Sequence, residues 1–179
     1  VGAGHDAERI PGIDLRVQEG DSVNLGELQA TVIEVPGHTS GHIAYYFPDD
    51  GVAFVGDTLF ALGCGRLFEG TPAQMWQSLS KLMALPDDTV VYCAHEYTQA
   101  NARFAVTVDP ENAALLQRAA EIDRLRASGQ PTVPTRIGLE KATNPFLRAE
   151  SAGLAGALGL DVTDPVGVFA ETRRRKDQF

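Results

Sequence analysis

Blocks of apolar residues with the short spacing of β-strands fill the first half of the chain, whereas helical spacing dominates the second half. The predicted strands cover 28–35, 42–47, 52–58 and 89–96. The first is rich in β-branched residues and stops at Pro36-Gly37, and the second stops at the turn 48–51. The block VAFVGDT at 52–58 is so apolar that we expect it to be buried on both faces of a sheet.

Helical patterns begin at Thr71, which is suited to cap a helix that has Pro72 in its first turn. Further helices are predicted over 111–128, 145–160 and 164–175. No strand is predicted after Cys93. The pattern therefore predicts an α/β region over 1–97 that is followed by an all-α domain over 98–179.

Composition restricts the classes of function. The 179 residues are 44% hydrophobic and carry a net charge of -9, which argues against nucleic acid as a partner. No apolar run approaches the roughly 20 residues of a membrane span, so no membrane partner is expected. Cys64 and Cys93 form no CxxC pattern, and together with the lack of a signal-peptide layout they indicate a reducing, cytoplasmic compartment. The basic run at 173–176 is by itself typical of a solvated tail.

Three polar residues follow predicted strands: His38, Asp57 and His95. Taken singly, each histidine is more typical of an ordinary loop residue, and Asp57 could simply cap a turn. Taken together, they lie where strand ends meet in an α/β layer. Histidine and carboxylate side chains suit zinc or iron, and a carboxylate can bridge two ions, so the sequence indicates a metal site.

The segments PGHTSGH, VGDTLF and CAHEY resemble, in this order, three sequence motifs of the metallo-β-lactamase superfamily. The resemblance implies that His38 and His95 are metal ligands and that Asp57 bridges two metals. His42 matches a position that is usually structural, and we leave it out of the metal shell.

Three further segments resemble glyoxalase II: GCGRLFEGT at 63–71, NPFLR at 144–148 and RRRKDQF at 173–179. The fold that this resemblance implies is the C-terminal part of an αββα sandwich followed by a helical substrate-binding domain. The implied glutathione-binding residues are Arg66, Phe68, Tyr97, Arg173 and Lys176. On this interpretation the basic run contacts the ligand, because glutathione carries two carboxylates.

The resemblance implies hydrolysis of S-D-lactoylglutathione to D-lactate and glutathione by a hydroxide held between two divalent ions, with zinc, iron or manganese as the candidates. The family's HxHxDH motif is absent from these 179 residues. His5 lies in GHDAE without that spacing and is expected to be a surface residue. We expect the motif upstream of Val1, and we expect the chain alone to be inactive and to associate through an exposed sheet. The alternatives are another glutathione-thiol enzyme of the superfamily, such as a persulfide dioxygenase, and a non-catalytic fragment.

Overall fold

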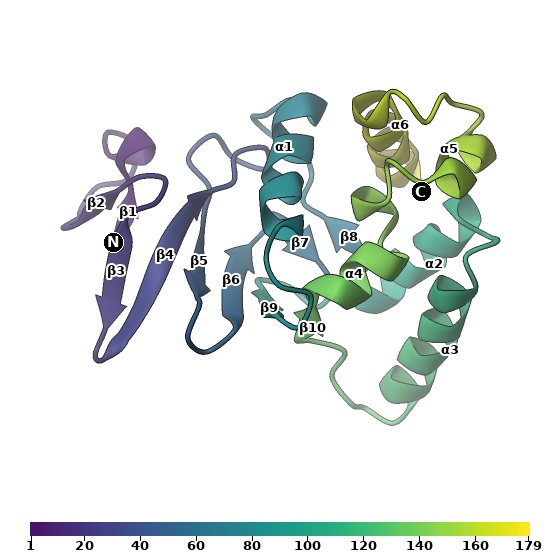
Figure 1. The fold of residues 1–179 in the computed structure, drawn as a ribbon, viewed down its shortest axis with the longest axis horizontal. Helices are drawn as coiled ribbons and strands as arrows, with labels where there is room; N and C mark the ends of the chain where they lie inside the picture. Colours follow the sequence, from purple (N-terminus) through teal and green to yellow (C-terminus); the bar gives the residue numbers. More distant parts are fainter.

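The computed structural model describes all 179 residues and contains one mixed sheet of six strands with helices on one side and at one end (Figure 1). In spatial order the sheet strands are β10 (Thr135–Arg136), β9 (Val90–Cys93), β6 (Val52–Gly56), β5 (Ile43–Phe47), β4 (Leu28–Glu34) and β3 (Ser22–Leu25). Two smaller pairs are β1 (Gly2–Ala3) with β2 (Arg16–Val17), and β7 (Leu59–Phe60) with β8 (Gly63–Cys64).

The six α-helices are α1 (Pro72–Met83), α2 (Thr98–Val108), α3 (Ala113–Ala127), α4 (Ile137–Thr143), α5 (Ala152–Leu158) and α6 (Pro165–Gln178), with 3₁₀ turns at Gly4–Asp6 and Pro145–Leu147. None of them combines the length and apolar character that a membrane crossing requires. Neighbouring sheet strands run antiparallel except β6 and β9, which are parallel and are joined by a connection that contains α1.

The helix α1 begins where the sequence predicts. The Thr71 hydroxyl accepts a hydrogen bond from the Gln74 amide N–H, and the Gln74 side chain accepts one from the Thr71 N–H, which forms a capping box. Met75 and Leu79 then point from the helix into the core against the sheet. The prediction of a helix that starts at Thr71 is confirmed.

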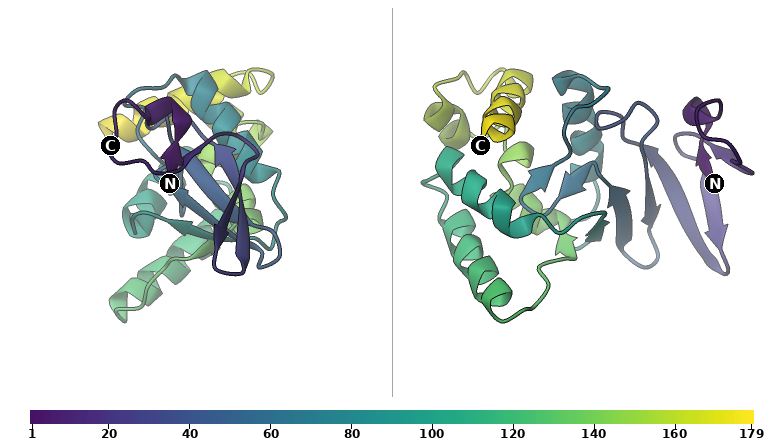
Figure 2. Two further views of the ribbon diagram at one scale, coloured as in Figure 1. Left: turned by 90° about the vertical axis from the view of Figure 1, so that its left-hand side faces the viewer. Right: turned by 180° about the vertical axis from the view of Figure 1, so that it is seen from behind.

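One face of the sheet packs on α1, and the other is open. Ala53, Val55 and Val91 belong to the buried core, whereas Phe54 is 47% exposed and stacks on the exposed ring of Tyr92 at 5.2 Å between centroids. The expectation that 52–58 is buried on both faces is therefore wrong. Its residues are apolar on both sides, but no helix covers the strands when the molecule is seen from behind (Figure 2).

The expectation of no strand after Cys93 is also wrong, because β10 pairs antiparallel with β9 at the sheet edge. The predicted helix over 145–160 is broken: a 3₁₀ turn covers 145–147, and α5 starts at residue 152. The Asn144 side chain caps the start of the 3₁₀ turn by accepting from the Phe146 N–H, and α5 begins separately after its own N-cap residue, Ser151. The helices predicted over 111–128 and 164–175 are present as α3 and α6.

A single buried cluster of 22 residues extends from the sheet through α1 into the helical half, where Phe146 and Phe169 pack together. The helices α2 and α3 bury a second, smaller cluster that contains Leu62 from the β7–β8 hairpin. Both clusters join the two halves of the chain across the proposed division between 97 and 98, and this division remains a prediction. The sheet half and the helical half are therefore held together by shared hydrophobic cores.

Candidate active site

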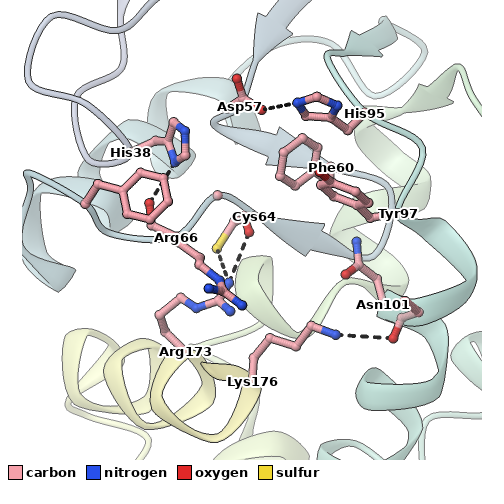
Figure 3. Close-up of a pocket in the computed structure, with 13 residues that line it drawn as sticks. His38, Asp57, Phe60, Cys64, Arg66, His95, Tyr97, Asn101, Arg173 and Lys176 are labelled. Carbon is pink, nitrogen blue, oxygen red and sulfur yellow. Dashed lines mark hydrogen bonds and ion pairs between the residues drawn. The ribbon is translucent and has the colours of Figure 1, made fainter. Parts of the chain in front are cut away.

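A cavity of about 490 Å³ opens where the strand ends of the sheet meet the helices (Figure 3). All eight predicted site residues line it: His38, Asp57, Arg66, Phe68, His95, Tyr97, Arg173 and Lys176. In Figure 3 the imidazole and carboxylate side chains lie at one end of the cavity, and Arg173 and Lys176 lie at the other. The cavity thus has one end rich in imidazole and carboxylate groups and one end rich in cations.

His38 lies in the loop after β4, and its ring orientation is fixed by one hydrogen bond. The Nδ1 atom is 2.8 Å from the carbonyl oxygen of Arg66. A carbonyl can only accept, so Nδ1 carries a proton, and in the neutral ring this tautomer leaves the lone pair on Nε2. A backbone carbonyl that holds one ring nitrogen in this way is the usual support of a histidine that binds a metal through the other nitrogen.

Asp57 and His95 form a pair at the end of β6 and β9, with 3.3 Å between Asp57 Oδ1 and His95 Nε2. A hydrogen bond with a side chain holds the backbone of each of these two residues. The Asp57 N–H donates to Nε2 of His42 at 3.0 Å, and the Cys93 thiol donates to the carbonyl of His95 at 3.3 Å. Burial lowers the pKa of His42, which favours the neutral ring that this contact requires.

His42 therefore acts as the support of Asp57, in keeping with the structural position expected for it. Gly56, with φ of +52°, makes this contact possible, since a Cβ atom there would lie 2.4 Å from His42 Nε2. His5, predicted to be a surface residue, lies outside the main cavity and is exposed.

The donor atoms of the site match part of a metal centre. Asp57 and His95 present an oxygen and a nitrogen side by side, and His38 presents a free Nε2 from the opposite wall. No group of three His, Cys, Asp or Glu side chains converges on one point anywhere in the chain. The residues fit part of a metal shell in type and orientation, and they do not enclose an ion.

The cationic side chains of Arg173, Arg66 and Lys176 differ in how many of their N–H groups are already bonded within the chain. Arg173 is only 5% exposed: its Nη1 donates to the carbonyl of Cys64, and its Nε and Nη2 donate to Asp177. The guanidinium of Arg66 is exposed, with Nε 3.9 Å from Asp177. Lys176 donates once, to the Ala100 carbonyl at 3.2 Å, which leaves N–H groups free for a ligand.

Lys176 also lies over the rings of Phe104 and Phe179, at 5.1 and 5.2 Å from their centroids. Burial lowers the pKa of its ammonium, and the nearby Arg173 and Arg66 lower it further. A ligand carboxylate at this end would relieve the repulsion among the three cations.

Aromatic rings line the middle of the cavity. The Tyr97 ring stacks on His95 at 5.1 Å and meets Phe60 edge-on at 5.4 Å. Phe68 is 68% exposed, with its centroid 4.8 Å from that of His38. These rings form an apolar surface between the polar ends of the cavity.

Five lining residues were not predicted from the sequence: Phe60, Cys64, Gly65, Ala100 and Asn101. Only the glycine-rich run gives a signal. A Cβ atom on Gly65 would lie 2.0 Å from the Asp57 carbonyl oxygen, so the chain needs glycine there to pass the site. Burial raises the pKa of the Cys64 thiol to about 11, which keeps it protonated and unreactive.

Comparison with known proteins agrees with this geometry. The profile of the metallo-beta-lactamase superfamily matches residues 2–95, and that of the hydroxyacylglutathione hydrolase C-terminus matches residues 96–179. The chain is 59% identical to a hydroxyacylglutathione hydrolase of Maricaulis maris over 175 residues, which cover 98% of the chain and 68% of that protein. It belongs to the hydroxyacylglutathione hydrolase family. The resemblance to glyoxalase II seen in the sequence is confirmed.

A second hydroxyacylglutathione hydrolase, from Ruegeria pomeroyi, is 60% identical over 179 residues, which are all of this chain and 70% of that protein. Among solved structures, ETHE1 from Myxococcus xanthus superposes with a TM-score of 0.58 at 25% identity, over 94% of this chain and 54% of that one. The chain thus spans about half of the solved structure and about 70% of the two curated relatives. The α/β class and the metallo-β-lactamase fold are confirmed, and hydroxyacylglutathione hydrolases are metal-dependent thioester hydrolases.

Proposed function

We propose that the cavity is the glutathione-facing part of an active site that hydrolyses S-D-lactoylglutathione to D-lactate and glutathione. The observation that carries the proposal is the division of one cavity into an imidazole–carboxylate end and a cationic end. A glutathione thioester has the matching division, since its carboxylates lie away from the reacting carbonyl. With its carboxylates bound at the cationic end, the glutathione thioester would extend along the cavity and place its reacting carbonyl beside His38, Asp57 and His95.

The cationic end would bind the glutathione carboxylates. Lys176 offers N–H groups that the chain leaves unused, and Arg66 offers an exposed guanidinium. A charge-assisted hydrogen bond of this kind stabilises a complex by about 1.5–3 kcal/mol. Tyr97 and Phe68 would contact the middle of the peptide, and Tyr97 can add a hydroxyl donor. Arg173 would contribute mainly through the protein itself, because its guanidinium already donates to Asp177 and to the Cys64 carbonyl.

The other end would hold two divalent ions, with zinc, iron and manganese as candidates. His38, through Nε2, and His95 would each bind one ion, and the Asp57 carboxylate would bridge them. When bound, the metals supply an activated water at neutral pH and polarise the thioester carbonyl. His42 holds the backbone of Asp57, and the Arg66 carbonyl holds the ring of His38, so both side chains are oriented before a ligand arrives.

The chain's own nucleophiles do not serve this reaction. Cys64 is buried, with its pKa raised to about 11, and the Cys93 thiol is committed to the His95 carbonyl, with its pKa also raised by burial. A thiol attacks as the thiolate, so neither cysteine is suited to nucleophilic catalysis. This supports direct attack by water on the thioester. Two cysteines kept as thiols also suit the cytoplasmic location that the sequence predicts.

The test uses the full-length gene product with S-D-lactoylglutathione, with release of free glutathione thiol as the readout. We expect turnover that is lost on chelation and restored by zinc, iron or manganese. Glutathione persulfide, with oxygen uptake as the readout, tests the persulfide dioxygenase alternative. Oxygen uptake without thioester cleavage would reject the proposed reaction. A protein that binds metal and cleaves neither substrate would favour a non-catalytic role.

A further inference from the structure

The β7–β8 hairpin carries the turn Ala61–Leu62 into the interior of the molecule. Leu62 is fully buried and has φ of +58°, the only positive φ among the non-glycine residues. A branched side chain in this region of backbone space is strained, and such a conformation persists only where its surroundings impose it. The surroundings of this hairpin are therefore expected to contain the groups that impose it.

Three side chains from the helical half bind the backbone of the hairpin. The Asn144 amide donates to the carbonyls of Phe60 and Gly63 at 3.2 and 3.0 Å. The Asn101 amide donates to the Ala61 carbonyl at 3.1 Å. The fourth contact has the opposite sense, because the Leu62 N–H donates to Oε2 of Glu140 at 2.8 Å.

Glu140 is the centre of this arrangement and is 0% exposed. Its Oε2 accepts from the Leu62 N–H and from Asn144, and its Oε1 accepts from the buried Arg118 and from Thr135. Both oxygens are thus fully used. A buried ion pair often stabilises a protein no more than apolar residues of the same volume would, so burial alone does not account for a carboxylate here. A backbone N–H at the tip of a hairpin, in contrast, requires an acceptor.

The hairpin in turn carries the contacts that orient both ends of the cavity. The Cys64 carbonyl, at the end of β8, accepts from Arg173. Two residues later, the Arg66 carbonyl accepts from the ring of His38. A displacement of the hairpin would move a predicted metal ligand and two predicted substrate cations together.

We propose that Glu140, Asn144 and Asn101 are positioning residues, which fix the β7–β8 hairpin and through it set the orientation of His38 and Arg173. For catalysis the inference rests on the proposed thioester hydrolysis. For the geometry of the hairpin it rests on the contacts alone. Asn101 reaches the cavity wall itself, whereas Glu140 and Asn144 act from behind it.

The experiment compares Glu140→Gln with Asp109→Asn in the full-length protein. The glutamine keeps the shape, but its carbonyl will face the charged Arg118 and its NH₂ will face the Leu62 N–H, which sets donor against donor. Asp109 is the matched control: it is 3% exposed, and its carboxylate accepts from Arg148 at 2.9 Å and from Asn112, both in the same helical half, rather than from the hairpin. Unfolding by urea is measured first, so that both variants are compared under conditions where each is fully folded.

In Glu140→Gln we expect the amide hydrogen of Leu62 to exchange about 10- to 100-fold faster, the range for a lost hydrogen bond to a charged acceptor. We expect kcat/KM for the thioester to fall at least tenfold, with both kcat and KM affected. Asp109→Asn should lose stability with kcat/KM and exchange in the hairpin unchanged. If the two variants lose stability equally and show the same exchange and the same kcat/KM, the positioning role is overturned.

If Glu140→Gln does not fold, Asn101→Ala replaces it, because it removes a single neutral hydrogen bond. Exchange in residues 61–63 should then rise about 2- to 10-fold. Unchanged exchange in this variant would overturn the inference. Since exchange needs no substrate, it decides the role of these residues even if the parent protein fails to cleave the thioester, which would reject the proposed function alone.

Discussion

Replacing Lys176 by methionine is expected to raise KM for S-D-lactoylglutathione about 10- to 100-fold, with kcat little changed. Lys176 donates one hydrogen bond within the chain and keeps the others for a ligand carboxylate. Loss of one charge-assisted hydrogen bond costs about 1.5–3 kcal/mol, which gives this range of KM. The carboxylate lies far from the reacting carbonyl, so the contact should be equally strong in the ground state and the transition state.

Methionine is chosen because it keeps the packing of the side-chain stem. The cation–π contacts to Phe104 and Phe179 contribute about 0.5–1 kcal/mol at a partly exposed site, and sulfur–aromatic contacts are of similar size. Stability should therefore change by no more than about 1 kcal/mol. The matched control is Lys141→Met on α4, which removes a surface lysine paired with Asp87 at 2.7 Å, outside the cavity. It should leave KM unchanged.

The assay is steady-state hydrolysis over a range of salt concentration and pH. Salt should raise KM of the parent more than KM of Lys176→Met, because it screens the attraction to the ammonium. The lowered pKa of Lys176 means that its proton is lost at a lower pH than in an ordinary lysine. As the pH is raised, KM of the parent should therefore rise at a lower pH than loss of the proton from an ordinary lysine would produce, and KM of the variant should not. A fall in kcat at constant KM, or an equal effect of Lys141→Met, would refute the assignment.

Four further outcomes are expected. Arg173→Ala should lower the urea midpoint as well as raise KM, because it removes the donor to the buried Cys64 carbonyl and the ion pair with the exposed Asp177. Asp57→Asn should nearly abolish turnover and lower metal content measured by elemental analysis, since a neutral amide is a poor bridge between cations. The pKa of His42 is lowered, so its contribution to stability is present above about pH 6.5 and is lost as the pH falls through its folded pKa. His42→Gln keeps an acceptor that does not titrate, and its urea midpoint should vary less between pH 7 and pH 5 than that of the parent. The chain 1–179 expressed alone should self-associate through its open sheet face in light scattering and bind metal weakly, and replacing Phe54 and Tyr92 by serine should reduce the association without unfolding it.

Local signals made part of the fold predictable. The helix α1 has its capping residue and its proline next to each other in the chain, so a few neighbouring residues define its start. The helix α2 has no side-chain cap at Tyr97 and no proline in its first turn, so no local signal marks where it starts. The strand β10 has two residues and exists because it pairs with β9, about 45 residues earlier in the chain. Pairing over such a distance cannot be predicted from local pattern.

The site divides in the same way. His38, Asp57 and His95 could be singled out because each lies in a short sequence motif that resembles the metallo-β-lactamase superfamily. The structure places all three around one cavity. The state of the cations could not be predicted. The basic run gives no sign that Arg173 is buried and paired while Lys176 keeps free donors. Partners that lie about 110 residues away along the chain, such as the Cys64 carbonyl, decide that difference.

The hydrogen bond from His38 to the Arg66 carbonyl connects the two ends of the cavity through one short segment of backbone. A ligand that draws Arg66 toward itself would change the orientation of the imidazole that we propose as a metal ligand. Such a coupling is reciprocal: if bound glutathione raises the affinity for metal by some factor, bound metal raises the affinity for glutathione by the same factor. Metal titrations with and without the glutathione product, which lacks the acyl group, would therefore measure the same coupling free energy as glutathione titrations with and without metal.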